Sequence, residues 1–192
     1  MEEQTVFDVI PCLESTGALR KGHYKLSSGR HSDSYIQCSQ LLRDPGMAVE
    51  AGRAIASRVK DIDLVFCPAL GAVVIGFTVA MALDTEMVFA ERVGEEMALR
   101  RGFEIPSGSR VLLVEDVITT GGSIMELARI VEDAGAEVAG LSCIVDRSGG
   151  LDIPYVLTPL VRLDAESWSP EECPMCEAGV PVDAPGSRFS GK

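Results

Sequence analysis

Short apolar runs rich in β-branched residues alternate with helical patterns from about Leu64 onward. Such alternation is typical of a parallel sheet whose strands are joined by crossover helices. The predicted strands are Leu64–Cys67, Glu86–Ala90, Arg110–Glu115, Glu137–Val145 and Val156–Val161, and the predicted helices are Val73–Ala82 and Ser123–Ala134. We therefore expect an α/β fold with a central parallel sheet flanked by helices.

The segments on either side of this core have other patterns. Glu3–Ser15 and Pro45–Lys60 are helical in pattern, and Tyr24–Cys38 between them is a turn-rich hairpin. The chain beyond Ser167 is rich in Pro and Gly, which predicts irregular structure on the surface. A length of 192 residues fits one domain. We divide it into residues 1–44, a helix and hairpin forming a hood; residues 45–165, the α/β core; and residues 166–192, an irregular tail.

Charge and hydropathy argue against several classes of function. The formal net charge of -12 argues against nucleic-acid binding, which depends on Lys and Arg. No apolar run approaches the roughly 20 residues that span a bilayer, and the start MEEQTVFDVI lacks the basic residues of a secretory signal. We therefore expect a cytoplasmic protein with no nucleic-acid or membrane partner. Cys12, Cys38, Cys67 and Cys143 stand alone in apolar or mixed stretches, as small hydrophobic residues do.

The most informative segment is Val111–Ser123, VLLVEDVITTGGS. Its leading apolar residues predict a strand covered on both faces, and ligands of α/β sheets bind beyond the carboxyl ends of strands. The Thr/Gly run leads into a predicted helix, whose backbone N–H groups and dipole favour an anion such as phosphate. The pair Glu115-Asp116 would repel a polyphosphate but suits ribose hydroxyls and a positively charged sugar. A pentose phosphate satisfies both halves.

Three other interpretations fit this segment less well. It lacks the Gly-Lys-Ser/Thr ending of a nucleoside triphosphate loop and the GxGxxG spacing of a dinucleotide site. An ordinary surface turn with helix-capping Thr and Ser leaves the acid pair directly after a buried strand unexplained.

The segment resembles the phosphoribosyl pyrophosphate motif of the type I phosphoribosyltransferases, in which two acids and a Thr/Gly loop follow a hydrophobic strand. The resemblance implies the fold of that family and catalytic contacts from Glu115 and Asp116 to the ribose hydroxyls. It implies further contacts to phosphoribosyl pyrophosphate from Val117, Ile118, Thr119, Thr120, Gly121, Gly122 and Ser123. Mg²⁺, carried on the substrate phosphates rather than in a protein cage, is the expected cofactor.

Two more segments bear on the base that accepts the ribose. Gly22–Tyr35 resembles the N-terminal hairpin of orotate phosphoribosyltransferases, and Asp146-Arg147 resembles the family's Asp-Arg pair, whose Arg binds orotate. A planar guanidinium can meet a carboxylate in two parallel hydrogen bonds. The implied orotate contacts are Ser27, Tyr35, Thr119 and Arg147. On the residues alone, Arg147 could also be a surface arginine beside a turn.

Two loops are expected to act on the leaving diphosphate. Cys67–Ala72 follows the first core strand, where the family has its diphosphate loop, although a plain strand-to-helix turn fits as well. Arg92–Ser109 is charged and long for a strand connection, and it corresponds to the family's mobile loop. The implied contacts are Ala69, Leu70 and Gly71 in the first loop and Arg92, Arg100 and Arg101, with catalytic roles, in the second.

The chain departs from the family in these loops. Gly71-Ala72 and Ser27 stand where many members have Lys, and loop 92–109 contains no His. Arginine cannot act as a general acid near neutral pH, so the loop arginines are expected to clamp the diphosphate. The resemblance also implies a homodimer in which loop 92–109 reaches the neighbouring site.

Cys173 and Cys176 have the spacing of half a zinc site. The sequence offers no second Cys pair and no His cluster beside them, and both histidines of the chain, His23 and His31, fall in the hairpin. We expect each histidine to be structural or adjacent to substrate. For the cysteine pair, free thiols, a labile disulfide and a zinc ion shared between two tails stay open.

Together these features predict an enzyme, a pentosyltransferase that converts orotate and phosphoribosyl pyrophosphate into orotidine 5′-monophosphate and diphosphate in pyrimidine synthesis. One alternative is a phosphoribosyltransferase for a purine base or uracil. Another is a regulatory protein that binds phosphoribosyl pyrophosphate without turnover.

Overall fold

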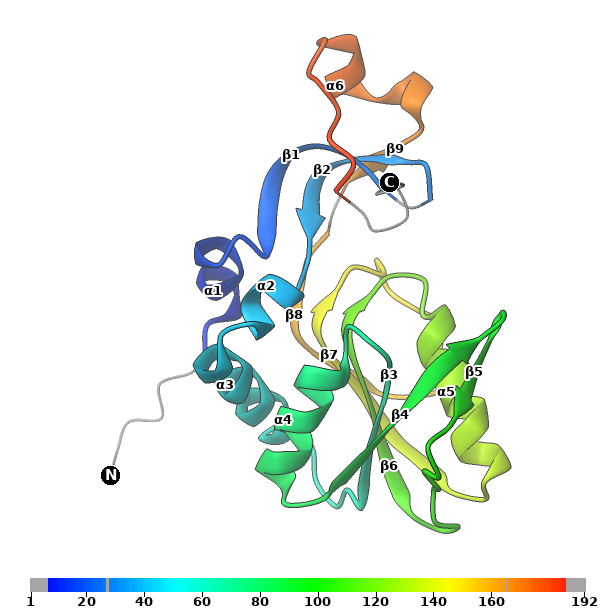
Figure 1. The fold of residues 1–192 in the computed structure, drawn as a ribbon. Coiled ribbons are helices and arrows are strands. Elements are labelled where there is room, and N and C mark those ends of the chain that lie inside the picture. Colours follow the sequence, from blue (N-terminus) through cyan, green and yellow to red (C-terminus); the bar gives the residue numbers. More distant parts are fainter. Residues whose placement is uncertain (1–6, 27, 165, 186–192) are drawn as a thin grey trace.

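The computed structural model describes residues 7–26, 28–164 and 166–185. Its core is a six-stranded sheet in the order β5-β4-β3-β6-β7-β8, parallel except for the β4–β5 pair (Figure 1). The strands are β3 (Leu64–Pro68), β4 (Glu86–Val93), β5 (Glu96–Leu99), β6 (Arg110–Ile118), β7 (Glu137–Asp146) and β8 (Leu157–Arg162). The main helices of the core are α3 (Pro45–Ala56), α4 (Val73–Leu83) and α5 (Gly122–Asp133).

Alternate residues of the central strand β6 enter two hydrophobic clusters. Leu112 and Val114 pack with the residues of α3 and α4, whereas Val111 and Leu113 pack with those of α5. All four side chains are fully buried. The sheet is therefore covered on both faces, as the unbroken apolar run predicted.

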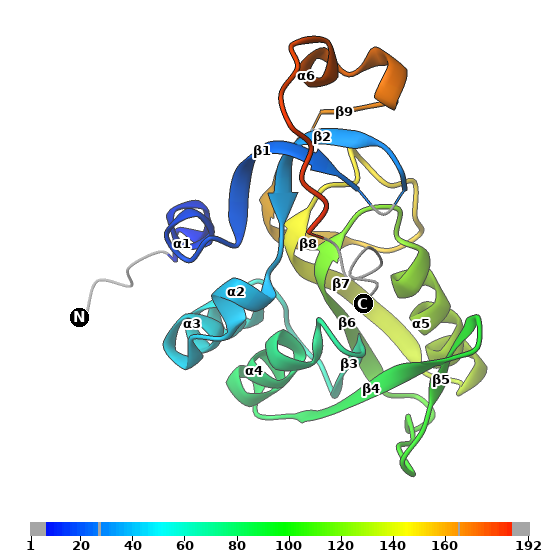
Figure 2. The same cartoon turned by 45° about the horizontal axis from the view of Figure 1, so that its top comes forward.

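The N-terminal part forms a second, smaller sheet. Helix α1 (Val9–Ser15) precedes the antiparallel strands β1 (Leu19–Lys25) and β2 (His31–Ile36), and α2 (Ser39–Leu42) leads back to the core. Strand β9 (Ser167–Trp168) of the tail pairs with the other edge of β2. Figure 2 shows this three-stranded sheet beyond one end of the core sheet, with the tail helices η1 (Pro170–Glu172) and α6 (Pro174–Glu177) outermost.

The central sheet is parallel as predicted except at one edge, where an antiparallel strand was not predicted. Gly94, at φ +63°, and Glu95 form a two-residue turn after β4, and the chain returns antiparallel as β5. Met97 and Leu99 then pack against the cluster that contains α5. The segment 92–109, expected to be one long loop, therefore includes the end of β4 and the whole of β5.

Several boundaries also differ from those predicted. Strand β6 continues to Ile118, because Val117 and Ile118 still pair with β7, so the acid pair lies within the strand rather than after it. Helix α3 ends at Ala56 rather than Lys60, and α1 begins at Val9, while the start of the predicted first helix lies outside the described residues.

The tail was expected to be irregular, but β9, η1 and α6 give it short regular elements; most of its described residues are exposed, as expected for a surface segment. Cys173 is buried, which a tail lying loosely on the surface would not achieve. In the part of the chain that the structure describes, no helix has the length and apolar character needed to cross a bilayer.

Helices α3 and α4 approach closely at Gly52. A Cβ atom added to Gly52 would lie 2.6 Å from Thr78, including its backbone carbon, which cannot move away as a flexible side chain could. We expect Gly52→Ala to lower the free energy of unfolding by about 1–3 kcal/mol, the usual cost of overpacking. Thermal unfolding measures this.

Arg53→Ala is the control, because Arg53 is the next residue of the same helix and its ion pair with Glu50 is exposed. It should change the free energy of unfolding by less than about 1 kcal/mol. Equal stability of the Gly52→Ala protein and the parent would contradict the close approach of the two helices.

Candidate active site

The Thr/Gly loop lies between the end of β6 and the start of α5. Gly121 has φ +74°, a conformation that favours glycine, and a Cβ there would also lie 3.0 Å from the end of the Leu151 side chain. Helix α5 starts at Gly122 and runs for 12 residues, which directs unpaired backbone N–H groups and the positive end of its dipole at the loop. An open pocket of about 270 Å³ is lined by Glu115 and by residues 117–124. The structure thus brings the predicted phosphate loop together around one hollow.

The two acids lie side by side near the end of β6. The Asp116 carboxylate accepts a hydrogen bond from the Val117 N–H at 2.9 Å, and the Glu115 carboxyl group accepts one from the Asp116 N–H at 3.2 Å. Burial, with the adjacent Asp116 charge, raises the pKa of Glu115 well above its usual range. Glu115 therefore holds a proton near neutral pH and can donate a hydrogen bond to a hydroxyl as well as accept one.

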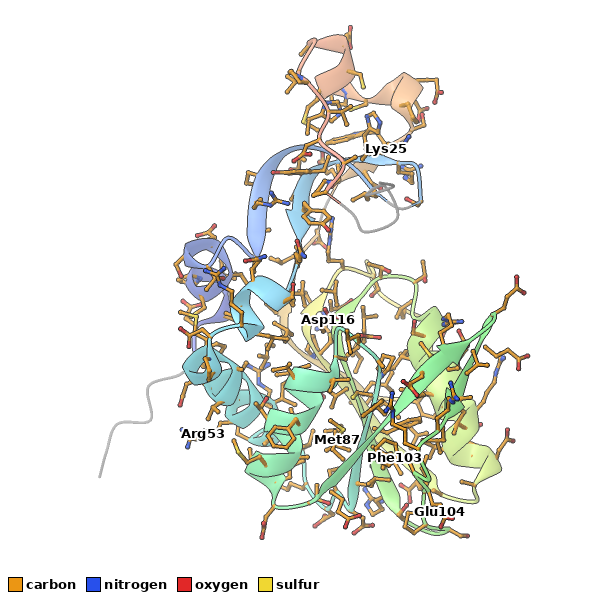
Figure 3. All side chains as sticks on the ribbon, viewed as in Figure 1. Lys25, Arg53, Met87, Phe103, Glu104 and Asp116 are labelled. Carbon is orange, nitrogen blue, oxygen red and sulfur yellow. The ribbon has the colours of Figure 1, made fainter. Side chains whose placement is uncertain are left out.

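The loop predicted to bind diphosphate lies against this acid pair. A Cβ at Gly71 would lie 3.0 Å from Asp116 Oδ2, so the backbone of Gly71 lies directly beside the carboxylate. The Ala69 N–H donates to the Ala90 carbonyl at 2.7 Å, Leu70 is exposed, and the peptide bond between Ala69 and Leu70 is cis. Figure 3 shows Asp116 at the end of the core sheet that faces the N-terminal hairpin.

Arg147 lies where β7 ends, beside β6. Its N–H donates to the Ile118 carbonyl at 2.8 Å, and the carboxylate of Asp146 accepts from the N–H and hydroxyl of Ser148 at 2.9 and 2.6 Å, which fixes the turn. The Arg147 guanidinium lies 3.5 Å from the Ser32 hydroxyl of β2, and burial lowers its pKa. A half-buried cation thus lies between the core and the hairpin, close to the carboxyl end of β6.

The hairpin residues predicted to contact the base are placed unevenly. Ser27 lies outside the described residues. The Tyr35 ring lies 5.6 Å from the Tyr24 ring, centroid to centroid, and the Arg20 guanidinium lies 5.2 Å from the Tyr35 centroid. The structure therefore places Tyr35 in an aromatic and cationic stack on the hairpin.

Sequence reasoning missed two hairpin residues beside Arg147. Ser32 contacts the guanidinium as described, and the negative charge of Asp33 acts on Arg147. Asp33 Oδ1 is buried without a hydrogen-bond partner among the described residues. Buried acceptors normally have partners, so this oxygen is available to a ligand. Both residues lie within the hairpin segment Gly22–Tyr35, and that position was the signal that could have found them.

The loop arginines are bound within the chain. Arg92 forms an ion pair with Glu126 of α5 at 2.9 Å, and Arg101 forms one with Glu91 at 2.7 Å while lying over the Phe89 ring. These contacts lower the pKa values of both glutamates. The structure thus shows Arg92 and Arg101 in surface ion pairs.

The cysteines of the core are inert, whereas those of the tail have polar neighbours. Burial raises the pKa of Cys38 well above its usual range and that of Cys67 to about 12, as expected for small hydrophobic residues. Cys173 and Cys176 instead lie beside His23 and His31, which the sequence did not connect with them. These four residues could hold a metal ion.

Comparison with known proteins identifies the class. A family model described as the phosphoribosyl transferase domain matches residues 37–157, which include the β6 acids, the Thr/Gly loop and Arg147. The chain belongs to the phosphoribosyltransferase family. Individual relatives then show which members of this family the chain is similar to in sequence.

The curated orotate phosphoribosyltransferase of Caldicellulosiruptor bescii is 47% identical over 182 residues, covering 93% of this chain and 96% of the relative. That of Thermotoga maritima is 43% identical over 179 residues, covering 92% and 96%. By these identities the chain groups with the orotate phosphoribosyltransferases of the family, as the hairpin and Asp146-Arg147 predicted.

Solved structures agree on the fold. The orotate phosphoribosyltransferase of Aeropyrum pernix has a TM-score of 0.70 at 25% identity, covering 81% of this chain and 94% of that one. An adenine phosphoribosyltransferase of Thermoanaerobacter pseudethanolicus has a TM-score of 0.58 at 21% identity, covering 68% and 88%, which shows a shared fold alone. The predicted type I phosphoribosyltransferase fold is confirmed.

The raised pKa of Glu115 predicts a pH-dependent stability. An unfolded glutamate has a pKa of about 4.3, so above that pH the folded state holds a proton that the unfolded state has lost. The stabilisation from this proton is complete below pH ~4 and declines as the pH rises toward the folded pKa. Glu115→Gln has no proton to lose, so its stability relative to the parent should rise between pH 5 and 8. We expect a relative gain of at least about 1 kcal/mol, or about 2–4 °C in Tm.

Thermal unfolding at both pH values measures the effect, with the exposed Glu104→Gln as the control. A stability difference between Glu115→Gln and the parent that stays constant from pH 5 to 8 would contradict the raised pKa.

Proposed function

We propose that this chain transfers the phosphoribosyl group of phosphoribosyl pyrophosphate to orotate, giving orotidine 5′-monophosphate and diphosphate in pyrimidine synthesis. The observation that carries the proposal is one arrangement at the carboxyl ends of β6 and β7. A phosphate-binding helix start, an acid pair and a half-buried arginine lie there together. These groups match the 5-phosphate, the ribose and the orotate carboxylate in turn.

The reaction breaks the bond between the anomeric carbon and the diphosphate oxygen, and forms a bond from that carbon to a ring nitrogen of orotate. The proton of that nitrogen leaves with the diphosphate. As the bond breaks, positive charge develops on the ribose, and the half-buried carboxylate of Asp116 stabilises it. Glu115, protonated at first, binds the ribose hydroxyls as donor and acceptor.

Charge must also be neutralised on the leaving group. In the loop Ala69–Gly71, the Ala69 N–H is bonded to the Ala90 carbonyl, and the N–H groups of Leu70 and Gly71 are offered to the diphosphate beside Asp116. Mg²⁺ bound to the substrate phosphates supplies further positive charge, in keeping with its preference for phosphate oxygens. The Asp116 carboxylate beside Gly71 suits a substrate that arrives with such an ion, because this negative charge would repel a bare polyphosphate.

Arg92, Arg100 and Arg101 are proposed to clamp the departing diphosphate. The ion pairs of Arg92 and Arg101 are exposed, and exposed pairs contribute only about 0–1 kcal/mol each. An incoming polyanion can therefore replace Glu126 and Glu91 at little cost. The released arginines would then supply the positive charge that many family members obtain from a Lys at the position of Gly71-Ala72.

Base recognition is assigned to Arg147, with Thr119, Ser27 and Tyr35 as further contacts. The guanidinium is half-buried, and the Asp146–Ser148 turn fixes the backbone that carries it, which favours paired hydrogen bonds with a carboxylate. Asp33 Oδ1 offers an acceptor to a ring N–H of the pyrimidine. A purine has no carboxylate to match the arginine, which favours orotate.

Arg147→Ala should raise the KM for orotate by about 30-fold or more, because a buried charge-assisted pair is worth about 2–5 kcal/mol. The KM for phosphoribosyl pyrophosphate should change far less, and Arg147→Lys should recover only part of the loss. Orotate absorbance under steady-state conditions gives both constants.

Arg110→Ala is the matched control, since this exposed arginine lies at the opposite end of β6. If orotate is not consumed while guanine, xanthine or uracil is, the substrate assignment fails.

A homodimer is proposed through the exposed face of α4. Val74, Phe77 and Met81 are spaced along one side of the helix, with Leu70 just before it, and they are 44–83% exposed. A contiguous apolar stripe of this kind marks an interaction surface. A second copy seated there would let loop 92–109 reach the neighbouring site.

The six free cysteines suit the reducing cytoplasm.

Phe77→Glu should convert the dimer into monomers, because it places a charge within the apolar stripe of both copies. Val156→Glu is the control, as Val156 is 74% exposed but lies outside α4. Light scattering after size exclusion measures the mass. If Phe77→Glu remains a dimer, the interface does not lie on this face of α4.

A further inference from the structure

Four side chains from the two ends of the chain converge beside the hairpin. His23 of β1 and His31 of β2 meet Cys173, the residue before α6, and Cys176 within α6. One ligand atom from each, His23 Nε2, His31 Nδ1 and the two Sγ atoms, lies within 4.8 Å of the others. Figure 1 shows how the tail folds over the hairpin to bring α6 there.

The separations fit a tetrahedral ion. With Zn–N of about 2.0–2.1 Å and Zn–S of about 2.3 Å, ligand atoms at tetrahedral corners lie roughly 3.3–3.8 Å apart. The two ring nitrogens are 2.8 Å apart, and Cys176 Sγ lies 3.7 Å from His23 Nε2 and 3.3 Å from His31 Nδ1. Cys173 Sγ lies 3.4 Å from His23 Nε2. All separations among the four atoms are within 4.8 Å, so roughly 1 Å of adjustment in the widest pair brings them to a tetrahedron.

Hydrogen bonding alone does not account for this cluster. His23 Nδ1 lies 2.8 Å from the Val180 carbonyl and donates to it, which leaves Nε2 of the neutral ring with one lone pair. Three groups surround that lone pair: His31 Nδ1 and both thiols. If His31 Nδ1 donates to that lone pair, neither thiol has a free ring acceptor; if His31 Nδ1 instead accepts from Cys176, two lone pairs face each other at 2.8 Å. A cation at the centre accepts a lone pair from all four.

The contact from His23 Nδ1 to Val180 is also what a metal-bound histidine shows. Its second ring nitrogen commonly donates to a carbonyl, which orients the ring toward the ion. His23, His31 and Cys173 are buried, whereas Cys176 is exposed. Two imidazoles and two thiols select zinc over magnesium or calcium, which prefer oxygen ligands.

We propose that His23, His31, Cys173 and Cys176 bind one structural Zn²⁺ ion that fastens the tail to the hairpin. All four positions of the tetrahedron are filled by protein, which is the mark of a structural rather than a catalytic site. One chain supplies the complete set, so the ion does not need the second copy that a lone cysteine pair would require.

The other attachments of the described tail residues to the hairpin, among them the β2–β9 pairing and hydrogen bonds from Arg30 and Ser32, are short. Strand β9 has two residues, and η1 and α6 have three and four, too few for independent helices. Two hydrogen bonds of 2.8 Å, from the Lys25 N–H to the Asp183 carbonyl and from the Asp183 N–H to the His23 carbonyl, join the tail to β1. A zinc ion joining residues about 150 positions apart would bind only the folded arrangement, so its binding free energy would stabilise the attachment of the tail to the hairpin.

The ion would also stabilise the base-binding side of the active site, a consequence that rests on the proposed function. His31 is followed directly by Ser32, which contacts Arg147, and Arg30 donates to the Ser167 hydroxyl at 3.0 Å. Fixing His31 therefore fixes the strand that faces the guanidinium.

Metal content tests the site directly. The full chain, made without a histidine tag, is reduced, equilibrated with ZnCl₂, desalted and measured by elemental analysis. About one zinc per chain is expected, and Co²⁺ in its place should show the intense d–d absorption of a tetrahedral site together with thiolate charge-transfer bands. Chain that retains no zinc under these conditions, or that holds a Cys173–Cys176 disulfide after reduction, would overturn the proposal.

Cys176→Ser is the variant of choice, because its exposed side chain is not needed to fill the core. It should retain less than about a tenth of the zinc after dialysis against a chelator, and its Tm should no longer respond to added zinc. Cys12→Ser, a half-buried thiol elsewhere, should behave as the parent. Equal zinc retention by Cys176→Ser and Cys12→Ser would exclude Cys176 as a ligand.

The readouts separate this inference from the proposed function. Zinc bound by a chain inactive on every base would support the metal site and refute the orotate assignment. In an active chain, removing zinc should raise the KM for orotate several-fold more than that for phosphoribosyl pyrophosphate. Equal changes in the two KM values would show that the ion stabilises the tail but not the base-binding side of the active site.

Discussion

The enclosure of β6 between two helical layers is the constraint on which the rest of the structure depends. Val111–Val114 are fully buried, with alternate side chains packed toward α3 and α4 or toward α5. Polar side chains can therefore appear only where the strand emerges from that cover. Glu115 and Asp116 emerge first, and pairing with β7 continues to Ile118 before the chain turns into the helix. Strand register thus sets how far the acids lie from the phosphate loop.

An acidic protein that binds a polyanion must arrange its positive charge locally. The net charge is -12, yet the start of α5, the half-buried Arg147 and the proton on Glu115 all make the site less negative than composition suggests. Burial raises the pKa of Glu115, and the charge of its sequence neighbour Asp116 adds to that rise. A site of this kind gains its substrate selectivity from position rather than from overall charge.

Features carried by consecutive residues could be predicted from the sequence, and those that depend on distant contacts could not. The Val111–Ser123 motif gave the site because strand, acids and helix start follow one another directly. Strand β5 was not predicted because its position depends on the packing of Met97 and Leu99 against the cluster around α5. The ion pair of Arg101 with Glu91 also depends on the turn at Gly94 and Glu95 that leads into β5. The meeting of His23 with Cys173 joins residues 150 apart, a distance at which sequence spacing carries no signal.

The pairing of β2 with β9 has a consequence for the order of events during synthesis. The three-stranded sheet takes its middle strand from residues 31–36 and its last from residues 167–168. Every strand of the core is therefore made before the sheet beside Arg147 can close. A nascent chain that has completed β8 holds its phosphate loop but leaves the edge of β2 open, so the emerging protein would acquire its sugar-phosphate half before its base-recognition half.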